Sequence, residues 1–296
     1  TELCLAFDPT KRASVAVAQS AIEALDDKAF NAKPRFGVIK HLGAGAMGTV
    51  VKYSNNGKPV AIKTATSEYE KDLLNEIQCH RQFSASQHIA RFISANETPF
   101  FMQLQIEFCD NRDLSYHIDE QSLPDAYFKP ITIGILKGLQ TMHAAGVWHC
   151  DIKPANVLLN KLWQPKISDF GLAMFARDAK RRKEAVGTPS FVAPEIINGP
   201  CYTEKADIYS FGILFHLMAT SLDAYAHSYS ESLFLTNVAN GSLRPSFSER
   251  QEINPDVKTL IVLCERYHHQ QRLTASEALS TAEMMNTSRF IMRFKP

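Results

Sequence analysis

The densest group of side chains that could perform chemistry lies in residues 149–156. Asp151 could accept a proton from an attacking hydroxyl, Lys153 could neutralise a phosphate oxygen, and Asn156 could hold a metal ion through its amide oxygen. Thirteen residues after Asn156, Asp169 adds a second carboxylate on a turn hinged by a glycine. Either stretch alone is compatible with an ordinary polar loop, but the two in this order make that interpretation improbable.

The order of these residues resembles the catalytic loop and the metal-binding loop of eukaryotic-type protein kinases. The resemblance implies that Asp151 is the catalytic base and that Lys153 stabilises charge on a transferring phosphoryl group. It also implies that Asn156 and Asp169 bind a metal ion, so that ATP and Mg²⁺ are the expected cofactors. The elements that position these residues should then follow the order of a kinase domain.

A glycine-rich stretch, residues 42–50, comes first in that order. Its G-x-G-x-x-G pattern is weak evidence alone, because dinucleotide-binding folds use it with a helix that opens at the last glycine. Here residues 49–53 are β-branched and aromatic, and residues 60–63 are strand-like again after a turn, so a β-hairpin is predicted. The hairpin resembles the kinase loop that covers the phosphates, where glycines let the backbone approach closely. The resemblance assigns ATP binding here to Leu42, Gly43, Ala44, Gly45, Ala46, Met47, Gly48, Thr49 and Val50.

A lysine ends the second strand-like stretch, residues 60–63. This stretch resembles the kinase strand whose lysine pairs with the α- and β-phosphates of ATP. Without that resemblance, Lys63 still ends a buried strand and would need a carboxylate nearby. A helix predicted over residues 67–83 supplies one, and we select Glu76 because it lies among apolar positions that would face the core.

Residues 89–108 predict two strands, after which a polar segment breaks the pattern. This region resembles the connection between the two kinase lobes, where Ile106 would limit the depth of the adenine site. The backbones of Glu107 and Cys109 would hydrogen-bond adenine, and the Cys109 thiol would only pack. The nucleotide contacts implied outside the glycine-rich loop and the lysine strand are Ala61, Glu107, Cys109, Asp113 at a ribose hydroxyl and Leu158 beneath adenine.

The segment that follows the metal-binding loop resembles a kinase activation segment, which ends in the Ala-Pro-Glu sequence at Glu195. Thr188 together with Lys153 resembles the serine/threonine branch of the family, and Thr188 is expected to belong to the platform for a protein substrate. Asp207 is expected to tie the catalytic-loop backbone to a core helix. Arg272 is expected to pair with Glu195 in a structural role, since breaking a buried pair of this kind is costly.

Cys150 stands where many protein kinases carry an arginine that pairs with a phosphate on the activation segment. A cysteine has no fixed positive charge, and residues 172–186 contain no Ser, Thr or Tyr that could carry a phosphate. Both features predict a non-RD kinase, one without this arginine, whose activity does not require phosphorylation of the segment. A basic cluster in the segment could attract acidic substrates, although a solvated loop explains it as well. The cluster consists of Arg177, Lys180, Arg181, Arg182 and Lys183.

The composition of the chain limits its possible size class, partners and compartment. The chain has 296 residues, of which 45% are hydrophobic, enough for a large core in one or two domains. A formal net charge of +1 favours neither nucleic acid nor an anionic membrane as a partner. The six cysteines are scattered without a Cys-x-x-Cys pair, which argues for free thiols in a reducing, cytoplasmic compartment and against a zinc site. The most apolar helix-like stretch, residues 208–222, is too short and too polar to span a bilayer.

The resemblance covers residues 35–285 and implies an α+β, two-lobed fold. The N-lobe, residues 35–108, should be a small antiparallel sheet with one main helix, and the C-lobe, residues 113–285, should be mainly helical. Residues 1–34 are expected to form a helical extension that packs on the domain or, as a second possibility, binds a regulatory partner. Residues 286–296 form a tail.

Two other classes of protein share this fold. A pseudokinase would act as a non-catalytic interaction module, and loss of a phosphate-binding, base or metal-binding residue would favour it, but all of these are present. A kinase of small molecules is the other class. Thr188, Glu195 and Arg272 argue against it, because these residues resemble the parts that build a platform for protein substrates. Protein substrates are therefore the expected partners.

Overall fold

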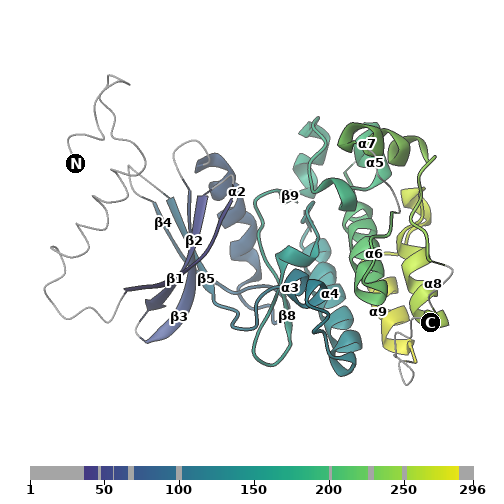
Figure 1. The fold of residues 1–296 in the computed structure, drawn as a ribbon. Coiled ribbons are helices and arrows are strands. Elements are labelled where there is room, and N and C mark those ends of the chain that lie inside the picture. Colours follow the sequence, from purple (N-terminus) through teal and green to yellow (C-terminus); the bar gives the residue numbers. More distant parts are fainter. Residues whose placement is uncertain are drawn as a thin grey trace, which may run out of the picture.

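The computed structural model describes residues 37–45, 48–55, 57–65, 70–97, 102–199, 202–225, 230–248 and 252–286. This part of the chain forms a β-sheet lobe and a helical lobe that lie side by side (Figure 1). The predicted extension and the tail beyond residue 286 lie outside the described residues. Within the described ranges, no helix is both long enough and apolar enough to cross a membrane.

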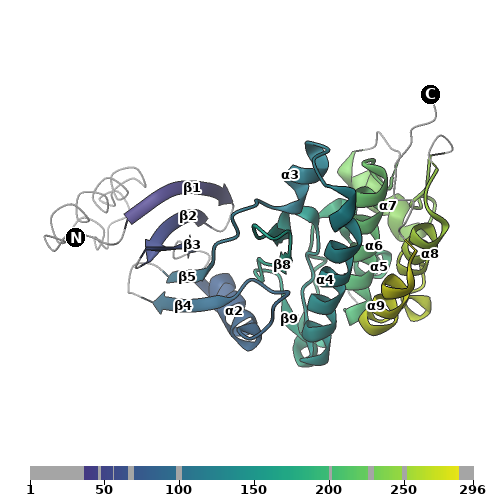
Figure 2. The same cartoon turned by 90° about the horizontal axis from the view of Figure 1, so that it is seen from below.

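The sheet lobe contains one five-stranded antiparallel sheet with the order β1-β2-β3-β5-β4 (Figure 2). Its strands are β1 (Gly37–Gly45), β2 (Gly48–Asn55), β3 (Lys58–Ala65), β4 (Phe92–Glu97) and β5 (Met102–Glu107). β1 and β2 form the predicted hairpin. Between β2 and β3, Gly57 adopts a φ of 78°, a left-handed conformation that glycine enters without steric cost. β3 is the central strand, which explains why its apolar residues Val60, Ala61 and Ile62 are buried.

One helix, α2 (Glu70–His80), packs against the sheet. Its residues Leu73 and Ile77 share a buried cluster with Met102 and Leu104 of β5. Burying a leucine side chain in this way contributes about 2 kcal/mol. The single helix predicted over residues 67–83 is wrong at its end, because Arg81–Phe83 form a separate 3-10 turn. Such turns commonly tighten the last turn of a helix and pair its free carbonyls.

The helical lobe is organised around α6 (Glu204–Thr220), which lies between α4 (Asp125–Ala144) and α8 (Pro255–Cys264) (Figure 1). α6 is buried on almost all sides because its sequence is apolar around the whole helix. The Thr203 side chain caps the start of α6 by accepting a hydrogen bond from the Lys205 N–H. The other helices are α3 (Leu114–Asp119), α5 (Pro194–Asn198), α7 (Glu231–Asn240) and α9 (Ala275–Met284).

Short antiparallel strand pairs position the loops that carry the reactive residues. β6 (Val147–Trp148) pairs with β9 (Met174–Phe175), and β7 (Val157–Leu159) pairs with β8 (Pro165–Ile167). The catalytic loop runs from β6 to β7, and the Asp169 loop runs from β8 to β9. The two loops therefore start and finish at the same two strand pairs. The α+β, two-lobed fold predicted from the sequence is confirmed.

Candidate active site

Lys63 and two carboxylates form an ion-pair triad between the lobes. Lys63 lies on β3, Glu76 lies on α2, and Asp169 lies in the loop between β8 and β9. The Lys63 Nζ is 2.8 Å from Glu76 Oε2 and 2.8 Å from Asp169 Oδ1. Glu76 also accepts a hydrogen bond from the Phe170 backbone N–H at 3.3 Å. The structure thus contains the Lys63–Glu76 ion pair that the sequence predicts, together with a second ion pair between Lys63 and Asp169.

Within this triad the Lys63 ammonium and the Asp169 carboxylate stabilise each other's charge. Burial by itself lowers the pKa of Lys63, but the negative charges of Glu76 and Asp169 outweigh burial and raise this pKa above its ordinary value. Burial acts to raise the pKa of Asp169, and the Lys63 ammonium overcomes it, so this pKa lies below its ordinary value. Lys63 is therefore a fixed cation at neutral pH, and Asp169 is a fixed anion. The side chain of Asp169 is 40% exposed, which leaves it accessible to a ligand.

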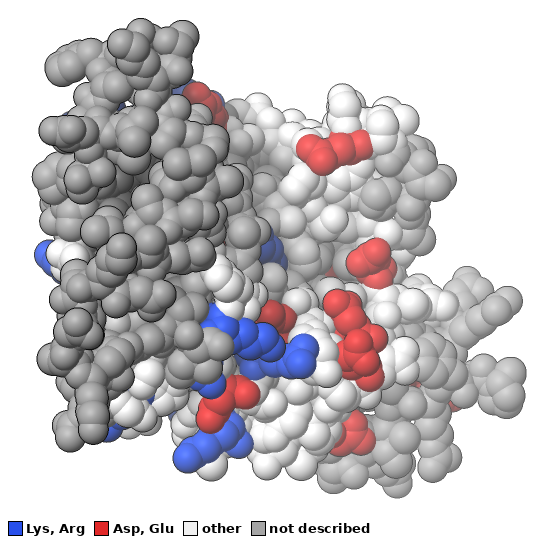
Figure 3. All heavy atoms as spheres, turned by 60° about the vertical axis from the view of Figure 1, so that its left-hand side comes forward, with Lys and Arg blue, Asp and Glu red and all other residues white. Residues whose placement is uncertain are grey.

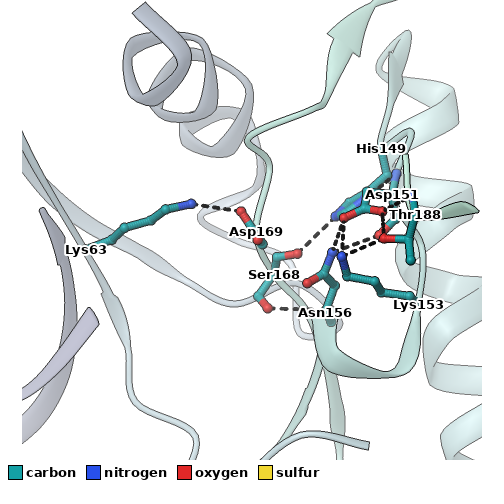
Figure 4. A network of polar contacts seen from close by, with 8 residues as sticks. All are labelled: Lys63, His149, Asp151, Lys153, Asn156, Ser168, Asp169 and Thr188. Atoms are coloured by element: carbon teal, nitrogen blue, oxygen red, sulfur yellow. Dashed lines mark hydrogen bonds and ion pairs between the residues drawn. The ribbon is translucent and has the colours of Figure 1, made fainter. Parts of the chain in front are cut away.

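Asp151 is the centre of a second polar cluster (Figure 4). Its Oδ1 accepts hydrogen bonds from the Thr188 backbone N–H at 3.0 Å and from the Thr188 hydroxyl at 2.7 Å. Its Oδ2 accepts a hydrogen bond from Asn156 Nδ2 at 3.0 Å and lies 2.8 Å from Lys153 Nζ. Because both oxygens have partners, the carboxylate is held in one orientation, which suits a general base.

Lys153 joins the catalytic loop to the activation segment. Its Nζ donates a hydrogen bond to Thr188 Oγ1 at 2.7 Å while it pairs with Asp151. Lys153, Thr188 and Asp151 therefore form a closed set of contacts. The backbone that carries Thr188 lies directly beside the carboxylate, since its own N–H bonds to Asp151.

Asn156 and Asp169 supply oxygens that would hold Mg²⁺. Asn156 Nδ2 donates to the Asp151 backbone carbonyl at 2.8 Å as well as to its side chain, so the amide oxygen is turned toward Ser168 and Asp169 (Figure 4). Mg²⁺ prefers oxygen ligands and keeps waters or substrate phosphates in its shell. One amide oxygen and one carboxylate fit that preference. Among the described residues, His, Cys, Asp and Glu side chains nowhere gather in threes around a possible metal position, so phosphate oxygens would complete the shell.

Asp207, on α6, holds the backbone of the catalytic loop. It accepts hydrogen bonds from the backbone N–H groups of His149 at 2.9 Å and Cys150 at 2.8 Å, and from His143 Nε2 at 2.9 Å. Cys150 has a φ of 65°, in the left-handed region that is unfavourable for a residue with a Cβ. Burial acts to raise the pKa of Asp207, but its hydrogen bonds and the neighbouring histidines outweigh burial and lower this pKa. An ionised Asp207 therefore stabilises a strained loop, through the link that the sequence predicts.

The residue after Asp169, Phe170, lies among aromatic rings in the core. Its ring stacks on His80 with centroids 4.7 Å apart and lies 5.8 Å from Phe83 and 5.2 Å from His149. His149 Nε2 lies 3.0 Å from the Ser168 carbonyl, which can only accept, so this nitrogen carries the proton. His149 therefore has a packing and hydrogen-bonding role, and the buried rings fix the position at which the chain reaches Asp169.

The hairpin of β1 and β2 carries the predicted glycine-rich loop. The two residues at its tip, Ala46 and Met47, lie outside the described residues. In the register of β2 and β3, Val50 lies opposite Lys63. The strand that leaves the loop therefore runs next to the lysine that would contact phosphates.

The connection after β5 is anchored to the helical lobe. The Glu107 carboxylate lies 3.1 Å from Lys166 Nζ on β8. Asp113 and Leu158 form an antiparallel bridge, so the predicted ribose and adenine contacts lie next to each other. Asp113 Oδ1 also accepts a hydrogen bond from the Tyr116 N–H at 3.0 Å and caps α3. The carboxylate that the sequence assigns to ribose therefore already has a structural partner.

Three further residues, Ala61, Ile106 and Cys109, lie in the region where the resemblance expects adenine. Ala61 on β3 lies opposite Ile106 on β5. Burial raises the pKa of the Cys109 thiol to about 12, so this thiol stays protonated and unreactive at neutral pH. This protonation state agrees with the prediction that the Cys109 side chain only packs.

Glu195 and Arg272 form a bidentate ion pair at the end of the activation segment. Arg272 Nη1 is 2.6 Å from Glu195 Oε1, and Nη2 is 2.7 Å from Oε2. Arg272 is buried and also donates to the Lys205 carbonyl at 3.1 Å. The pair connects the segment to the start of α6, which is consistent with the structural role predicted for Arg272 and Glu195.

Sequence reasoning missed three residues that act on this site. Asn75 Nδ2 donates to the Ala173 carbonyl at 2.7 Å and ties α2 to the activation segment. His80 lies under Phe170, and Arg182 reaches back to the start of the segment. The position of Asn75 next to Glu76 was a usable signal. His80, a single histidine in a helix, and Arg182, one arginine in a basic run, have no sequence signal that would have indicated their roles.

The charged surface is mixed. On the face seen in Figure 3, acidic and basic side chains of the described residues are interspersed, and neither sign forms a continuous field there. A nucleic-acid backbone or an anionic membrane would favour a continuous basic field. This face therefore shows no such field among its described residues.

Comparison with known proteins gives the same class as the fold and the site. The model of the family described as "Protein kinase domain" matches residues 36–282. The chain belongs to the protein kinase domain family. It is 29% identical over 250 residues to serine/threonine-protein kinase 4 homolog B of Dictyostelium discoideum, which covers 82% of this chain and 22% of that protein.

Other relatives show the range of architectures and names. The chain is 29% identical over 249 residues to a protein kinase and PP2C-like domain-containing protein of Arabidopsis thaliana, covering 72% of this chain and 38% of that protein. It is 28% identical over 253 residues to the dual specificity protein kinase shkB of Dictyostelium discoideum, covering 80% and 38%. The chain thus spans less than half the length of these curated relatives.

Proposed function

We propose that this domain transfers the γ-phosphoryl group of ATP to serine and threonine hydroxyls of protein substrates. The observation that carries the proposal is the closed set of contacts among Asp151, Lys153 and Thr188, all between 2.7 and 2.8 Å. In this proposal Asp151 is the base, Lys153 is the cation and Thr188 belongs to the substrate platform, and each lies within hydrogen-bond distance of the other two. The proposal assigns the activity to residues 35–285, with residues 1–34 as an extension.

Each polar group then has a stated task. When bound, ATP with Mg²⁺ supplies the phosphoryl group and neutralises part of its charge. Asp151 orients the substrate hydroxyl and accepts its proton, while the Lys153 ammonium stabilises negative charge beside it. Lys63, held by Glu76, binds phosphate oxygens from the other lobe. These are positioning and electrostatic contributions, which dominate phosphoryl transfer.

The geometry around Thr188 favours a short hydroxyl side chain as acceptor. The backbone N–H of Thr188 bonds directly to Asp151, so a substrate backbone on this platform also lies close to the base. A serine or threonine hydroxyl is one carbon from its Cα carbon and can reach the carboxylate from there. A tyrosine hydroxyl lies at the far side of a ring and would need the backbone to lie farther away.

We therefore expect phosphoserine and phosphothreonine as products. The purified protein is incubated with a degenerate peptide library, ATP and Mg²⁺, and the phosphorylated amino acids are separated and quantified. Because one relative is named a dual specificity kinase, phosphotyrosine is measured in the same samples. Mainly phosphotyrosine would contradict the proposed acceptor. The selected sequences would also show whether acidic residues are preferred around the acceptor.

The proposal includes independence from activation-segment phosphorylation. Cys150 offers no charge to a phosphate, and residues 172–186 have no hydroxyl side chain to modify. The nearest hydroxyl, Thr188, is already bonded to Asp151 and Lys153, where a phosphate would face a carboxylate. Both observations support a segment that is ordered without modification.

Phosphatase treatment is expected to leave turnover unchanged. The purified protein is treated with a phosphatase, mass spectrometry verifies that residues 169–195 are unmodified, and the initial rate is compared with that of a mock-treated sample. A collapse of activity that is reversed only when a phosphate returns to this segment would refute independence. A phosphatase inactivated before use serves as the control for handling.

A further inference from the structure

The basic cluster of the activation segment contains one residue that differs from the rest. Arg177, Lys180, Arg181 and Lys183 are exposed, but Arg182 is half-buried. Arg181 illustrates the contrast, because its side chain is 84% exposed and, within the described part of the chain, pairs with Asp178 alone, at 3.2 Å. Arg182 therefore has an environment that a solvated loop does not explain.

Arg182 contacts the start of the segment and a tyrosine that lies beyond its end. Its Nη1 donates to the Leu172 carbonyl at 2.7 Å, three residues after Asp169. Its guanidinium lies 5.7 Å from the ring centroid of Tyr202, near the outer limit of a cation–π contact. A hydrogen bond from a charged donor to a carbonyl is stronger than one from a neutral donor. The hydrogen bond from Arg182 to the Leu172 carbonyl therefore links two parts of the loop that are ten residues apart.

Tyr202 continues the link toward the catalytic base. Its hydroxyl donates to the Glu184 carbonyl at 2.9 Å and accepts from the Val186 N–H at 2.9 Å. The next residue, Gly187, has a φ of 116°, and a Cβ there would lie 2.9 Å from the Cys150 carbonyl. Thr188 comes next, and its backbone N–H and hydroxyl both donate hydrogen bonds to Asp151. The order of contacts therefore leads from Arg182 to the catalytic carboxylate.

The other end of the link is fixed by α2. Asn75 donates to the Ala173 carbonyl, next to the carbonyl that Arg182 holds, and α2 also carries Glu76. Burial and Asp207 raise the pKa of the Cys150 thiol, and the Arg182 guanidinium acts on this pKa in the opposite direction.

We propose that Arg182 is a positioning residue that holds the activation segment in its active arrangement from within, without a phosphate. It joins the start of the segment at Leu172 to the Tyr202-bound end and thereby places Thr188 beside Asp151. The link is made by an unmodified arginine side chain, so it needs no modifying enzyme. The inference rests on the proposed kinase function and names how that function is organised.

The test compares Arg182→Ala with Arg181→Ala, which removes the same charge from an exposed neighbour. Hydrogen exchange of residues 173–187 is measured without nucleotide, and kcat and KM are measured with a peptide substrate. Arg182→Ala should lose protection in this segment alone. Its kcat/KM for peptide should fall roughly 10- to 100-fold, the range for one hydrogen bond from a charged donor. Arg181→Ala should match the wild type, and Arg182→Lys should recover part of the loss.

The outcomes separate this proposal from the proposed function. If Arg182→Ala matches Arg181→Ala in hydrogen exchange and in kcat/KM, the link is wrong. If Arg182→Ala raises exchange throughout the domain and lowers its melting temperature, Arg182 supports the whole fold and the positioning role is also wrong. If the wild type transfers no phosphate, the proposed function fails, but local exchange in the two variants still decides whether Arg182 orders the segment.

Discussion

Replacing Asp151 with alanine is expected to reduce turnover roughly 10²- to 10⁴-fold, the usual contribution of a general base. The carboxylate is held by Thr188, Asn156 and Lys153, so no nearby group has the same position and the same capacity to accept a proton. Nucleotide affinity should change little, because Lys63 and Glu76 form a separate cluster. Turnover is measured with peptide at saturating ATP, and nucleotide binding is measured by calorimetry.

A matched control is Asp119→Ala, which removes an exposed carboxylate at the end of α3. This variant should keep wild-type turnover. If the Asp151 and Asp119 variants have equal rates, Asp151 is not the base. If the wild type binds ATP but transfers phosphate neither to peptides nor to itself, the domain is a non-catalytic interaction module on the same fold.

Acid should destabilise this domain through His80. The imidazole is fully buried on α2, its Nε2 donates to the Ala90 carbonyl, and among the described residues none pairs with its Nδ1. Burial lowers the pKa of His80 from 6.5 to about 4, although the Ala90 carbonyl acts in the opposite direction. Lys63 and His149 also lower this pKa, while Glu107 raises it. The folded protein therefore holds His80 neutral over a pH range in which the unfolded chain protonates it.

The direction of the pH effect follows from proton binding. Between pH 6.5 and about pH 4 the unfolded chain binds more protons at His80 than the folded protein does, so the free energy of unfolding falls as the pH falls. The full loss from this residue is about 3 kcal/mol, and most of it appears below pH 6.5. Denaturant unfolding is measured at several pH values, and the wild type is compared with His80→Leu.

The leucine variant isolates this residue from the carboxylates that also titrate in acid. His80→Leu should show a shallower fall in stability between pH 6.5 and pH 4, even if its stability at pH 7 is lower because the Ala90 carbonyl has lost its donor. His268→Gln, at an exposed histidine, should follow the wild type. Equal pH slopes for His80→Leu and the wild type would show that His80 protonates as easily in the folded protein as in the unfolded chain.

The amino-acid sequence by itself determined the parts of this protein that depend on neighbouring residues. Asp151, Lys153 and Asn156 lie within one loop, so their spacing alone brings them together. Apolar periodicity and turn residues predicted the β1–β2 hairpin and the helix that carries Glu76. Such local preferences act over a few residues, so they can be predicted without knowing which distant residues pack against them.

The tertiary structure decided which distant groups meet. Lys63 and Asp169 are 106 positions apart, and their contact exists only because α2 and the β8–β9 loop pack on the same side of β3. Arg181 and Arg182 are adjacent and chemically alike, but only the second of them finds the Leu172 carbonyl and the Tyr202 ring. An irregular loop has no periodicity to mark which side chain turns inward, so partners from elsewhere in the fold make that choice. His80 is the same case, because burial of an imidazole depends on Phe170 and Ala90, which lie outside its helix.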